Sequence, residues 1–322
     1  MEKIEHKYVP VNGLKLHVAE IGSESSPAVV FLHGFPETWY SWRHQMIAVA
    51  GSGYRAIAPE YRGFGLSDLP PEPEKTTFLD LDADLLALLD ALNLSKVFLI
   101  GKDFGAAVVS IFTLLHRDRV LGFVTMGVPF MPPRPPTHHH NLPEGLYISR
   151  WKVPGRAEAD FGRFDNKTVV RNIYIMFSRS ELPVAREDQE IMDLVEPNEP
   201  LPYWFTEEDL AIYGALYEKS GFRTALHVTY SYCQKLIGCV WSMDTRYDIS
   251  DPIVNIPAML IMGEKDYVMK FPRIEDYIRG GMAKSYAPKL EIVFVPEGSH
   301  FVQEQSPDEV NSLILNFLKS HN

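Results

Sequence analysis

Hydrophobic residues follow two patterns that alternate along this chain. Continuous apolar runs predict strands buried on both faces of a sheet, and they lie at residues 28–32, 54–59, 97–101, 120–126, 258–263 and 290–295. Runs with helical spacing lie between them, at residues 39–50, 78–92, 104–115, 274–279 and 307–318. Near the start, Asn12-Gly13 separates two β-prone runs and predicts a hairpin. Together the runs predict an α/β fold in which helices cover both faces of a mostly parallel sheet.

The alternation is interrupted after Val128. Residues 129–136 include five prolines, and from there to about Pro252 the hydrophobic spacing is helical. We therefore expect residues 1–128 and 253–322 to form one core, with residues 129–252 inserted between its halves as a helical lid. The insertion would lie over the carboxyl ends of the strands, where open α/β sheets bind ligands.

Composition narrows the classes of function. The chain has 322 residues and a net charge of −11, which favours neither nucleic acid nor an anionic membrane surface as a partner. No apolar run approaches transmembrane length, and the first thirty residues contain no secretory apolar segment. Cys233 and Cys239 belong to no metal motif, and two thiols fit a reducing compartment. We expect a cytoplasmic protein, with His138-His139-His140 in an exposed loop rather than at a metal.

The run at 97–101 ends in a motif that carries chemistry. Gly101-Lys102-Asp103-Phe104-Gly105 lies between a predicted strand and a predicted helix. Small residues two positions before and after the tip are what a strained nucleophile elbow requires. The usual tip residue is serine, whereas this chain has Asp103. A carboxylate can attack carbon directly and form an ester, so it needs no base to activate it.

Two further residues complete a constellation around that carboxylate. Asp266 follows the strand at 258–263, and His300 follows the strand at 290–295. Nucleophile, acid and histidine, in that order and each after a strand, are typical of the α/β-hydrolase fold. We expect Asp103 to attack, His300 to activate water for ester hydrolysis, and Asp266 to orient the imidazole. The backbone N–H groups of Phe35 and Phe104 are the expected oxyanion donors.

These motifs resemble the plant soluble epoxide hydrolases of the α/β-hydrolase superfamily over nearly the full chain. The resemblance rests on the segments 33–43, 61–68, 101–105, 263–266 and 298–301. It implies hydrolysis of an epoxide to a vicinal diol, without a metal or an organic cofactor. It also implies two lid tyrosines that bind the epoxide oxygen and donate a proton to it. Tyr147 matches the first tyrosine of the family.

The second lid tyrosine is harder to align. Counting without a gap puts Thr229 at its position, whereas one extra residue puts Tyr230 there. We predict Tyr230 rather than Tyr232, because a phenol can donate a proton and then carry the resulting charge.

The neighbours of Asp103 depart from the family, which usually has His before the nucleophile and Trp after it; here they are Lys102 and Phe104. The ammonium of Lys102 would favour an ionised Asp103 if it points inward, and it can equally point away. Glu37 resembles a family residue that helps to hold the hydrolytic water. We predict an apolar, aromatic pocket formed by Phe35, Phe104 and lid aromatics such as Tyr174. The residues expected to bind substrate are His33, Glu37, Lys102, Trp151 and Phe130.

Other functions fit the same fold. A haloalkane or haloacid dehalogenase uses the same Asp–His–Asp groups, but Phe104 lacks the N–H that would hold a departing halide. A specialised plant metabolic enzyme or a ligand receptor on a hydrolase fold are further alternatives. The sequence leaves open whether the protein is a monomer or a homodimer.

Overall fold

The structure is a computed structural model that describes residues 3–131, 142–228 and 251–322. Its described residues form an eight-stranded sheet in the order β1-β2-β4-β3-β5-β6-β7-β8. The strands are β1 (Glu5–Val11), β2 (Leu14–Ile21), β3 (Ala28–Leu32), β4 (Arg55–Pro59), β5 (Val97–Lys102), β6 (Val120–Met126), β7 (Ala258–Gly263) and β8 (Leu290–Val295). Strand β2 pairs antiparallel with β1 and β4, and all other pairs are parallel. The predicted mostly parallel sheet is therefore confirmed.

Position in the sheet explains the residue pattern of each strand. Every residue of the inner strands β3, β5 and β7 is buried, because helices cover both faces there. The edge strand β1 alternates between exposed and buried residues only in its second half. The predicted hairpin is also confirmed, since Asn12 and Gly13 have φ values of 49° and 81°, as two-residue hairpin turns require.

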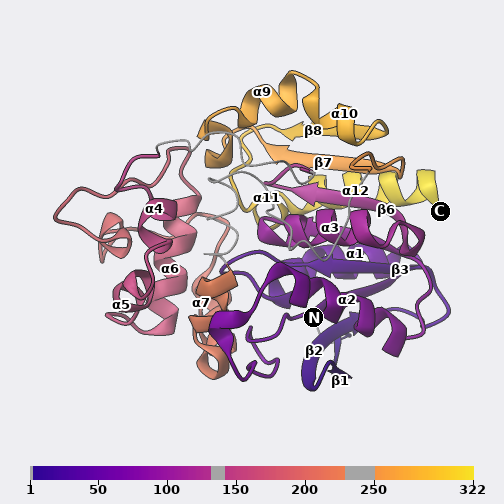
Figure 1. The fold of residues 1–322 in the computed structure, drawn as a ribbon, viewed down its shortest axis with the longest axis horizontal. Helices are drawn as coiled ribbons and strands as arrows, with labels where there is room; N and C mark the ends of the chain where they lie inside the picture. Colours follow the sequence, from indigo (N-terminus) through magenta and orange to yellow (C-terminus); the bar gives the residue numbers. More distant parts are fainter. Residues whose placement is uncertain (1–2, 132–141, 229–250) are drawn as a thin grey trace.

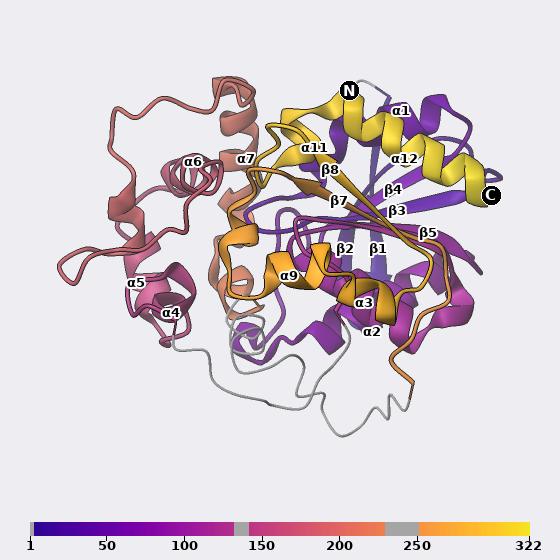
Figure 2. The ribbon, with the colours of Figure 1, turned by 90° about the horizontal axis from the view of Figure 1, so that it is seen from above.

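Helices of the core lie on both sides of the sheet (Figure 2). One face is covered by α1 (Arg43–Gly51) and α12 (Pro307–His321), and the other by α2 (Phe78–Ala91), α3 (Phe104–Leu115) and α9 (Ile274–Arg279). The remaining core helices are α10 (Met282–Tyr286) and α11 (Val302–Gln305), with the 3-10 turns η1 (Trp39–Trp42), η2 (Pro73–Lys75), η3 (Arg117–Arg119) and η5 (Tyr267–Lys270).

A second group of helices lies between β6 and β7 in the sequence. These lid helices are α4 (Tyr147–Trp151), α5 (Arg156–Phe161), α6 (Asn166–Phe177) and α7 (Glu207–Ser220), with the turn η4 (Ile191–Leu194). Figure 1 shows them together beside the sheet rather than on either of its faces. The helical character predicted for this part of the chain is thus confirmed for its described residues.

Polar side chains join the lid helices to the core. Arg43 at the start of α1 donates to Glu304 in α11 at 2.5 Å and to Asp209 in α7 at 2.9 Å. Tyr174 of α6 and Tyr213 of α7 also donate to the Glu304 carboxylate. Because these groups are buried or nearly so, each must find a partner when the lid packs, which fixes where the lid sits on the core.

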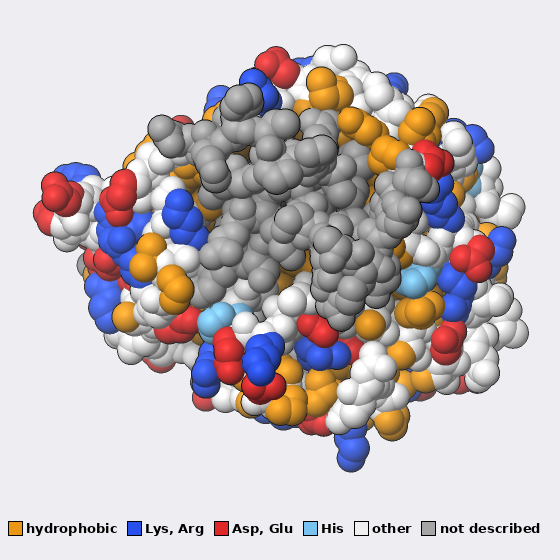
Figure 3. All heavy atoms as spheres, in the orientation of Figure 1, with side chains coloured by type: hydrophobic (Ala, Val, Ile, Leu, Met, Phe, Trp, Pro, Cys, Tyr) orange, Lys and Arg blue, Asp and Glu red, His pale blue; other side chains and the backbone are white. Residues whose placement is uncertain are grey.

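The described surface carries both signs of charge. Acidic and basic side chains are interspersed on the face drawn in Figure 3. Among the described residues, none of the helices has the length and apolar character needed to span a bilayer.

The turn between β5 and α3 is tightly packed against neighbouring backbone. A Cβ added to Gly105 would lie 2.2 Å from the carbonyl oxygen of Leu32. We therefore expect Gly105→Ala to lower the free energy of unfolding by more than about 2 kcal/mol, measured by urea denaturation. Gly51→Ala is the matched control, because a Cβ there meets nothing within 4 Å, and it should change stability by less than about 1 kcal/mol. Equal effects of the two substitutions would contradict this packing.

Candidate active site

Asp103 stands at the tip of the turn between β5 and α3. Its backbone has φ 54° and ψ −125°, a conformation that costs a non-glycine residue about 1–3 kcal/mol. Its N–H donates to the Met126 carbonyl at 3.0 Å and its carbonyl accepts from Ala106 at 3.0 Å, so the neighbouring strand and helix hold the turn. The backbone therefore has the strained form that a nucleophile elbow requires.

The structure brings Asp103, His300 and Asp266 together. His300 Nδ1 lies 3.0 and 3.1 Å from the two carboxylate oxygens of Asp266. Its Nε2 lies 3.4 Å from Asp103 Oδ2. Asp266 also accepts from the Val268 N–H at 2.9 Å, which fixes its carboxylate at the start of η5. An imidazole between these two carboxylates can take a proton on the Asp103 side while Asp266 stabilises its cation.

Charge and hydrogen bonds set the protonation of this group. Burial alone would raise the pKa of Asp103, but the hydrogen bond and charge of His300, then the charge of Lys102, lower it to about 2. Burial would lower the pKa of His300, but the charge of Asp266 and the hydrogen bonds of Asp103 and Asp266 together raise it. Asp103 is thus an anion at neutral pH, which is the form that can attack carbon.

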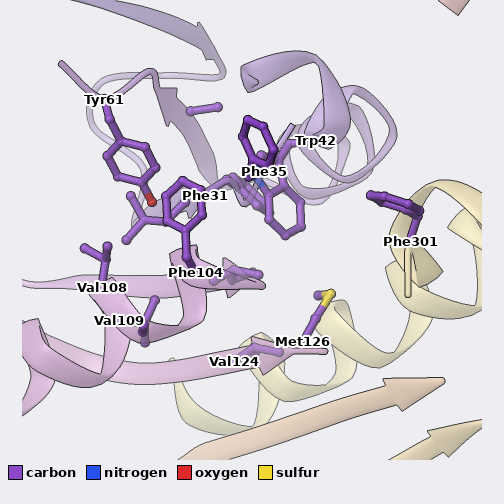
Figure 4. Close-up of a cluster of buried hydrophobic side chains, with 14 of the residues drawn as sticks. Phe31, Phe35, Trp42, Tyr61, Phe104, Val108, Val109, Val124, Met126 and Phe301 are labelled. Carbon is purple, nitrogen blue, oxygen red and sulfur yellow. The ribbon is translucent and has the colours of Figure 1, made fainter. Parts of the chain in front are cut away.

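Both expected oxyanion donors lie at the Asp103 carboxyl. The Phe35 N–H donates to Asp103 Oδ1 at 3.3 Å, and the Phe104 N–H also bonds to this carboxyl. The Phe35–Pro36 peptide bond is cis. The ring of Phe104 is 1% exposed and packs with Tyr61 and Phe64 at centroid distances of 5.6 Å. Figure 4 shows it beside Tyr61 in a cluster of buried side chains. That the Phe104 ring lines the substrate pocket stays a prediction.

Lys102 points inward and is wholly buried. Its Nζ has no hydrogen-bond partner among the described residues and lies 5.4 Å from the centre of the Phe301 ring. A Cβ placed on Gly127 would be 3.2 Å from this Nζ, 3.3 Å from Asp266 Oδ2 and 3.1 Å from His300 Cε1. The ammonium therefore borders the same small space as the acid and the imidazole.

Glu37 is a second wholly buried carboxyl beside the turn. It accepts from the Gly34 N–H at 2.8 Å and from the Gln303 amide. Burial raises its pKa to about 7, against the lowering effect of the Lys102 charge. A carboxyl that exchanges its proton near neutral pH can hold a water molecule as donor or as acceptor.

The other predicted substrate-binding residues differ in position. Trp151 lies edge-on to Phe35 at 6.2 Å between ring centres, close to the turn. His33 is wholly buried, bonds to the Gly34 carbonyl at 2.9 Å, and burial lowers its pKa to about 4. Phe130 is also wholly buried, with its ring 5.6 Å from Phe123 of β6. His33 and Phe130 thus pack into the core.

The structure describes two of the three tyrosines that the sequence analysis placed in the lid, Tyr147 and Tyr174. Tyr147 begins α4, and its hydroxyl lies 3.2 Å from that of Tyr267. Tyr230 lies outside the described residues, as do the two cysteines and the histidine run. The ring of Tyr174 stacks between Phe205 and Phe301 at 4.1 and 4.2 Å, and its hydroxyl donates to Glu304. Its place in the substrate pocket stays a prediction.

Sequence reasoning missed two residues at the site. Gln303, which bonds to Glu37, follows His300 by three positions. Tyr267 directly follows Asp266, and its place beside the acid was the available signal. Among the described residues, no group of three or more His, Cys, Asp or Glu side chains is arranged to hold a metal ion.

The raised pKa of Glu37 predicts a pH-dependent stability. A carboxyl that binds its proton more tightly when folded lowers the free energy of unfolding as the pH rises from 4.5 to about 7. Glu37→Gln removes this loss, so we expect the variant to be more stable than wild type by about 3 kcal/mol at pH 8 and about equal at pH 4.5. Urea unfolding across this range measures the difference.

The matched control is Glu309→Gln, at an exposed position of α12, which should keep the wild-type pH dependence. If Glu37→Gln kept it as well, the titration of Glu37 would not be its source.

Comparison with known proteins agrees with this geometry. Residues 27–307 match the family model described as the alpha/beta hydrolase fold. Two curated relatives from Siraitia grosvenorii, epoxide hydrolase 1 and epoxide hydrolase 2, are 41% and 38% identical to the chain, with 99% of each chain covered.

Solved structures give the same result. A crystal structure of an epoxide hydrolase from Vigna radiata superposes with a TM-score of 0.89 at 34% identity, covering 99% of both chains. Potato (Solanum tuberosum) epoxide hydrolase I gives a TM-score of 0.87 at 34% identity, covering 99% of this chain and 100% of that one. The chain therefore belongs to the α/β-hydrolase fold family, within the group that contains the plant epoxide hydrolases.

Proposed function

We propose that this protein hydrolyses apolar epoxides to vicinal diols through an ester on Asp103. The observation that carries the proposal is the His300 imidazole between two carboxylates, one of them at the elbow tip. A carboxylate in place of a serine hydroxyl makes an alkyl ester rather than an acyl ester. The names of the relatives support the same reaction.

The first step opens the ring. An Asp103 oxygen attacks an epoxide carbon, the carbon–oxygen bond of the ring breaks, and the epoxide oxygen takes a proton from Tyr147. Without that proton the leaving group would be an alkoxide, which is poorly stabilised near neutral pH. Tyr230 is proposed as the second phenol, on the sequence argument alone.

The second step hydrolyses the ester. His300 removes a proton from water, and the resulting hydroxide attacks the carboxyl carbon of Asp103. The N–H groups of Phe35 and Phe104 stabilise the oxyanion that forms there. Its collapse releases the diol and restores the Asp103 carboxylate, which now holds one oxygen from water. Glu37 is proposed to hold the attacking water.

The surroundings of the site support an apolar substrate. Phe35 packs edge-on against Trp151 and Phe222, and lies 6.3 Å from Phe161. These rings come from both the core and the described part of residues 129–252, which we propose as the lid over residues 1–128 and 253–322. We also propose that the protein works in the cytoplasm.

The ester mechanism predicts where oxygen from water goes. After several turnovers of an aryl or aliphatic epoxide in ¹⁸O water, we expect the peptide that contains Asp103 to gain ¹⁸O, detected by mass spectrometry. The peptide that contains Asp266 is the internal control and should stay unlabelled. Diol formation without label in Asp103 would overturn the ester route, and halide release from haloalkanes without any diol would overturn the reaction class.

The position of the Lys102 ammonium leads to a prediction about how kcat depends on pH. The Lys102 charge lowers the pKa of His300, whereas Asp266 raises it. Asp103 and Glu37 are the other titratable groups near this imidazole. Lys102→Met should raise the pKa of His300, so that the neutral base forms only at higher pH. We expect the acidic limb of kcat to move up by about one pH unit.

The matched control is Lys270→Met, because Lys270 is exposed at the end of η5. An unchanged acidic limb in Lys102→Met would show that the ammonium does not act on His300.

A further inference from the structure

The core supplies a buried phenol of its own, Tyr267, beside the His300 imidazole. Tyr267 is the first residue of η5, and the Asp266 carboxylate fixes this turn by accepting from the Val268 N–H. The Tyr267 ring lies 4.9 Å from the His300 ring and 4.9 Å from the Phe177 ring. Because its side chain is 3% exposed, its hydroxyl has to find a partner inside the protein.

That partner is the tyrosine proposed to protonate the epoxide. The hydroxyl oxygens of Tyr267 and Tyr147 are 3.2 Å apart, and either can be the donor. The two side chains come from different parts of the fold, since Tyr147 begins the lid helix α4 and Tyr267 belongs to the core. Both are buried, at 9% and 3% exposure, so the contact is shielded from solvent.

The direction of this hydrogen bond decides what it can do. If Tyr147 donated to Tyr267, its proton would be directed away from the substrate. If Tyr267 donates, this hydrogen bond does not use the Tyr147 proton, and the Tyr147 oxygen already has a donor when it becomes a phenolate. A buried phenolate without a donor would carry the full desolvation penalty of its charge.

The negative charge that develops on Tyr147 during ring opening favours the second direction, because a phenolate can only accept. Burial, then the charges of Tyr147, Asp103 and Asp266, raise the pKa of Tyr267 well above its ordinary value. Tyr267 therefore keeps its proton throughout the cycle and can donate it in a hydrogen bond to the Tyr147 oxygen as that oxygen gains negative charge. A group that cannot itself ionise is suited to stabilise the ionisation of its neighbour.

We propose that Tyr267 is a positioning residue for ring opening, whose hydroxyl donates to Tyr147 and thereby presents the Tyr147 proton to the epoxide oxygen. This inference rests on the proposed epoxide hydrolysis. As the bond from Asp103 to carbon forms and the epoxide carbon–oxygen bond breaks, the proton leaves Tyr147 and the Tyr267 hydrogen bond holds the resulting phenolate. The proton released by ester hydrolysis, first taken up by His300, returns to Tyr147.

The test separates the two steps of the reaction. In rapid-quench single-turnover experiments with a styrene oxide, mass spectrometry of the intact protein follows the ester on Asp103. Tyr267→Phe should form the ester roughly tenfold to a hundredfold more slowly, because a hydrogen bond to a charged group is lost. Hydrolysis of the ester, which does not use Tyr147 as an acid, should keep its rate.

A double-mutant cycle distinguishes positioning from packing. When Tyr147 is already Phe, Tyr267→Phe should slow ester formation less than twofold, because there is no phenolate left to stabilise. A role in packing alone would slow both steps, and its effect would be additive with Tyr147→Phe. Additive effects, or an unchanged rate in Tyr267→Phe, would overturn the inference while leaving the proposed function intact.

Tyr277→Phe is the matched control. Tyr277 is also a buried tyrosine of the core, but its hydroxyl donates to the Phe130 carbonyl at 2.8 Å, so both rates should stay at the wild-type value. Tyr267→Leu is a second variant without the hydroxyl if Tyr267→Phe does not fold, and thermal unfolding checks both. A wild-type protein that forms no ester with any epoxide would instead overturn the proposed function, and the role of Tyr267 with it.

Discussion

The backbone of Asp103 is the constraint on which the site depends. A positive φ at a non-glycine residue is unfavourable, and it persists here because Gly101 and Gly105 pack against backbone on both sides. The same turn aims the carboxylate at His300 and places the Phe104 N–H beside it. Local strain is thus offset by burial of the strand and helix that flank the turn, and the result is an anion in a fixed position.

A second feature of the site is the balance between acidic and basic groups buried around the Asp103 carboxylate. Three carboxyls, Asp103, Asp266 and Glu37, lie close to two basic groups, Lys102 and His300. Buried charge is tolerated only when it is paired or neutralised. The raised pKa of Glu37 shows how the excess is absorbed: near neutral pH, this carboxyl can take a proton instead of remaining an unpaired anion.

The sequence predicted the elements and the triad because both are local signals. Strand ends are visible as apolar runs, so the order of Asp103, Asp266 and His300 also predicted their proximity. The sequence could not show whether the Lys102 ammonium points inward. That depends on whether the helices packed on the sheet leave the side chain a path to solvent. Nor could the sequence show that Tyr174 contacts Glu304 of α11 or that Tyr267 of η5 contacts Tyr147, because both contacts depend on how the lid helices pack on the core.

Under the proposed mechanism, the two steps make opposite electrostatic demands. Ring opening moves negative charge from Asp103 to the epoxide oxygen, away from Lys102 and toward the phenols of Tyr147 and Tyr267. The ammonium therefore opposes this step, and the phenols favour it. Ester hydrolysis returns negative charge to the Asp103 carboxyl, beside the backbone donors and within the field of Lys102. A lysine in this position thus favours the second step at the expense of the first, whereas the proposed hydrogen bond from Tyr267 to Tyr147 favours the first.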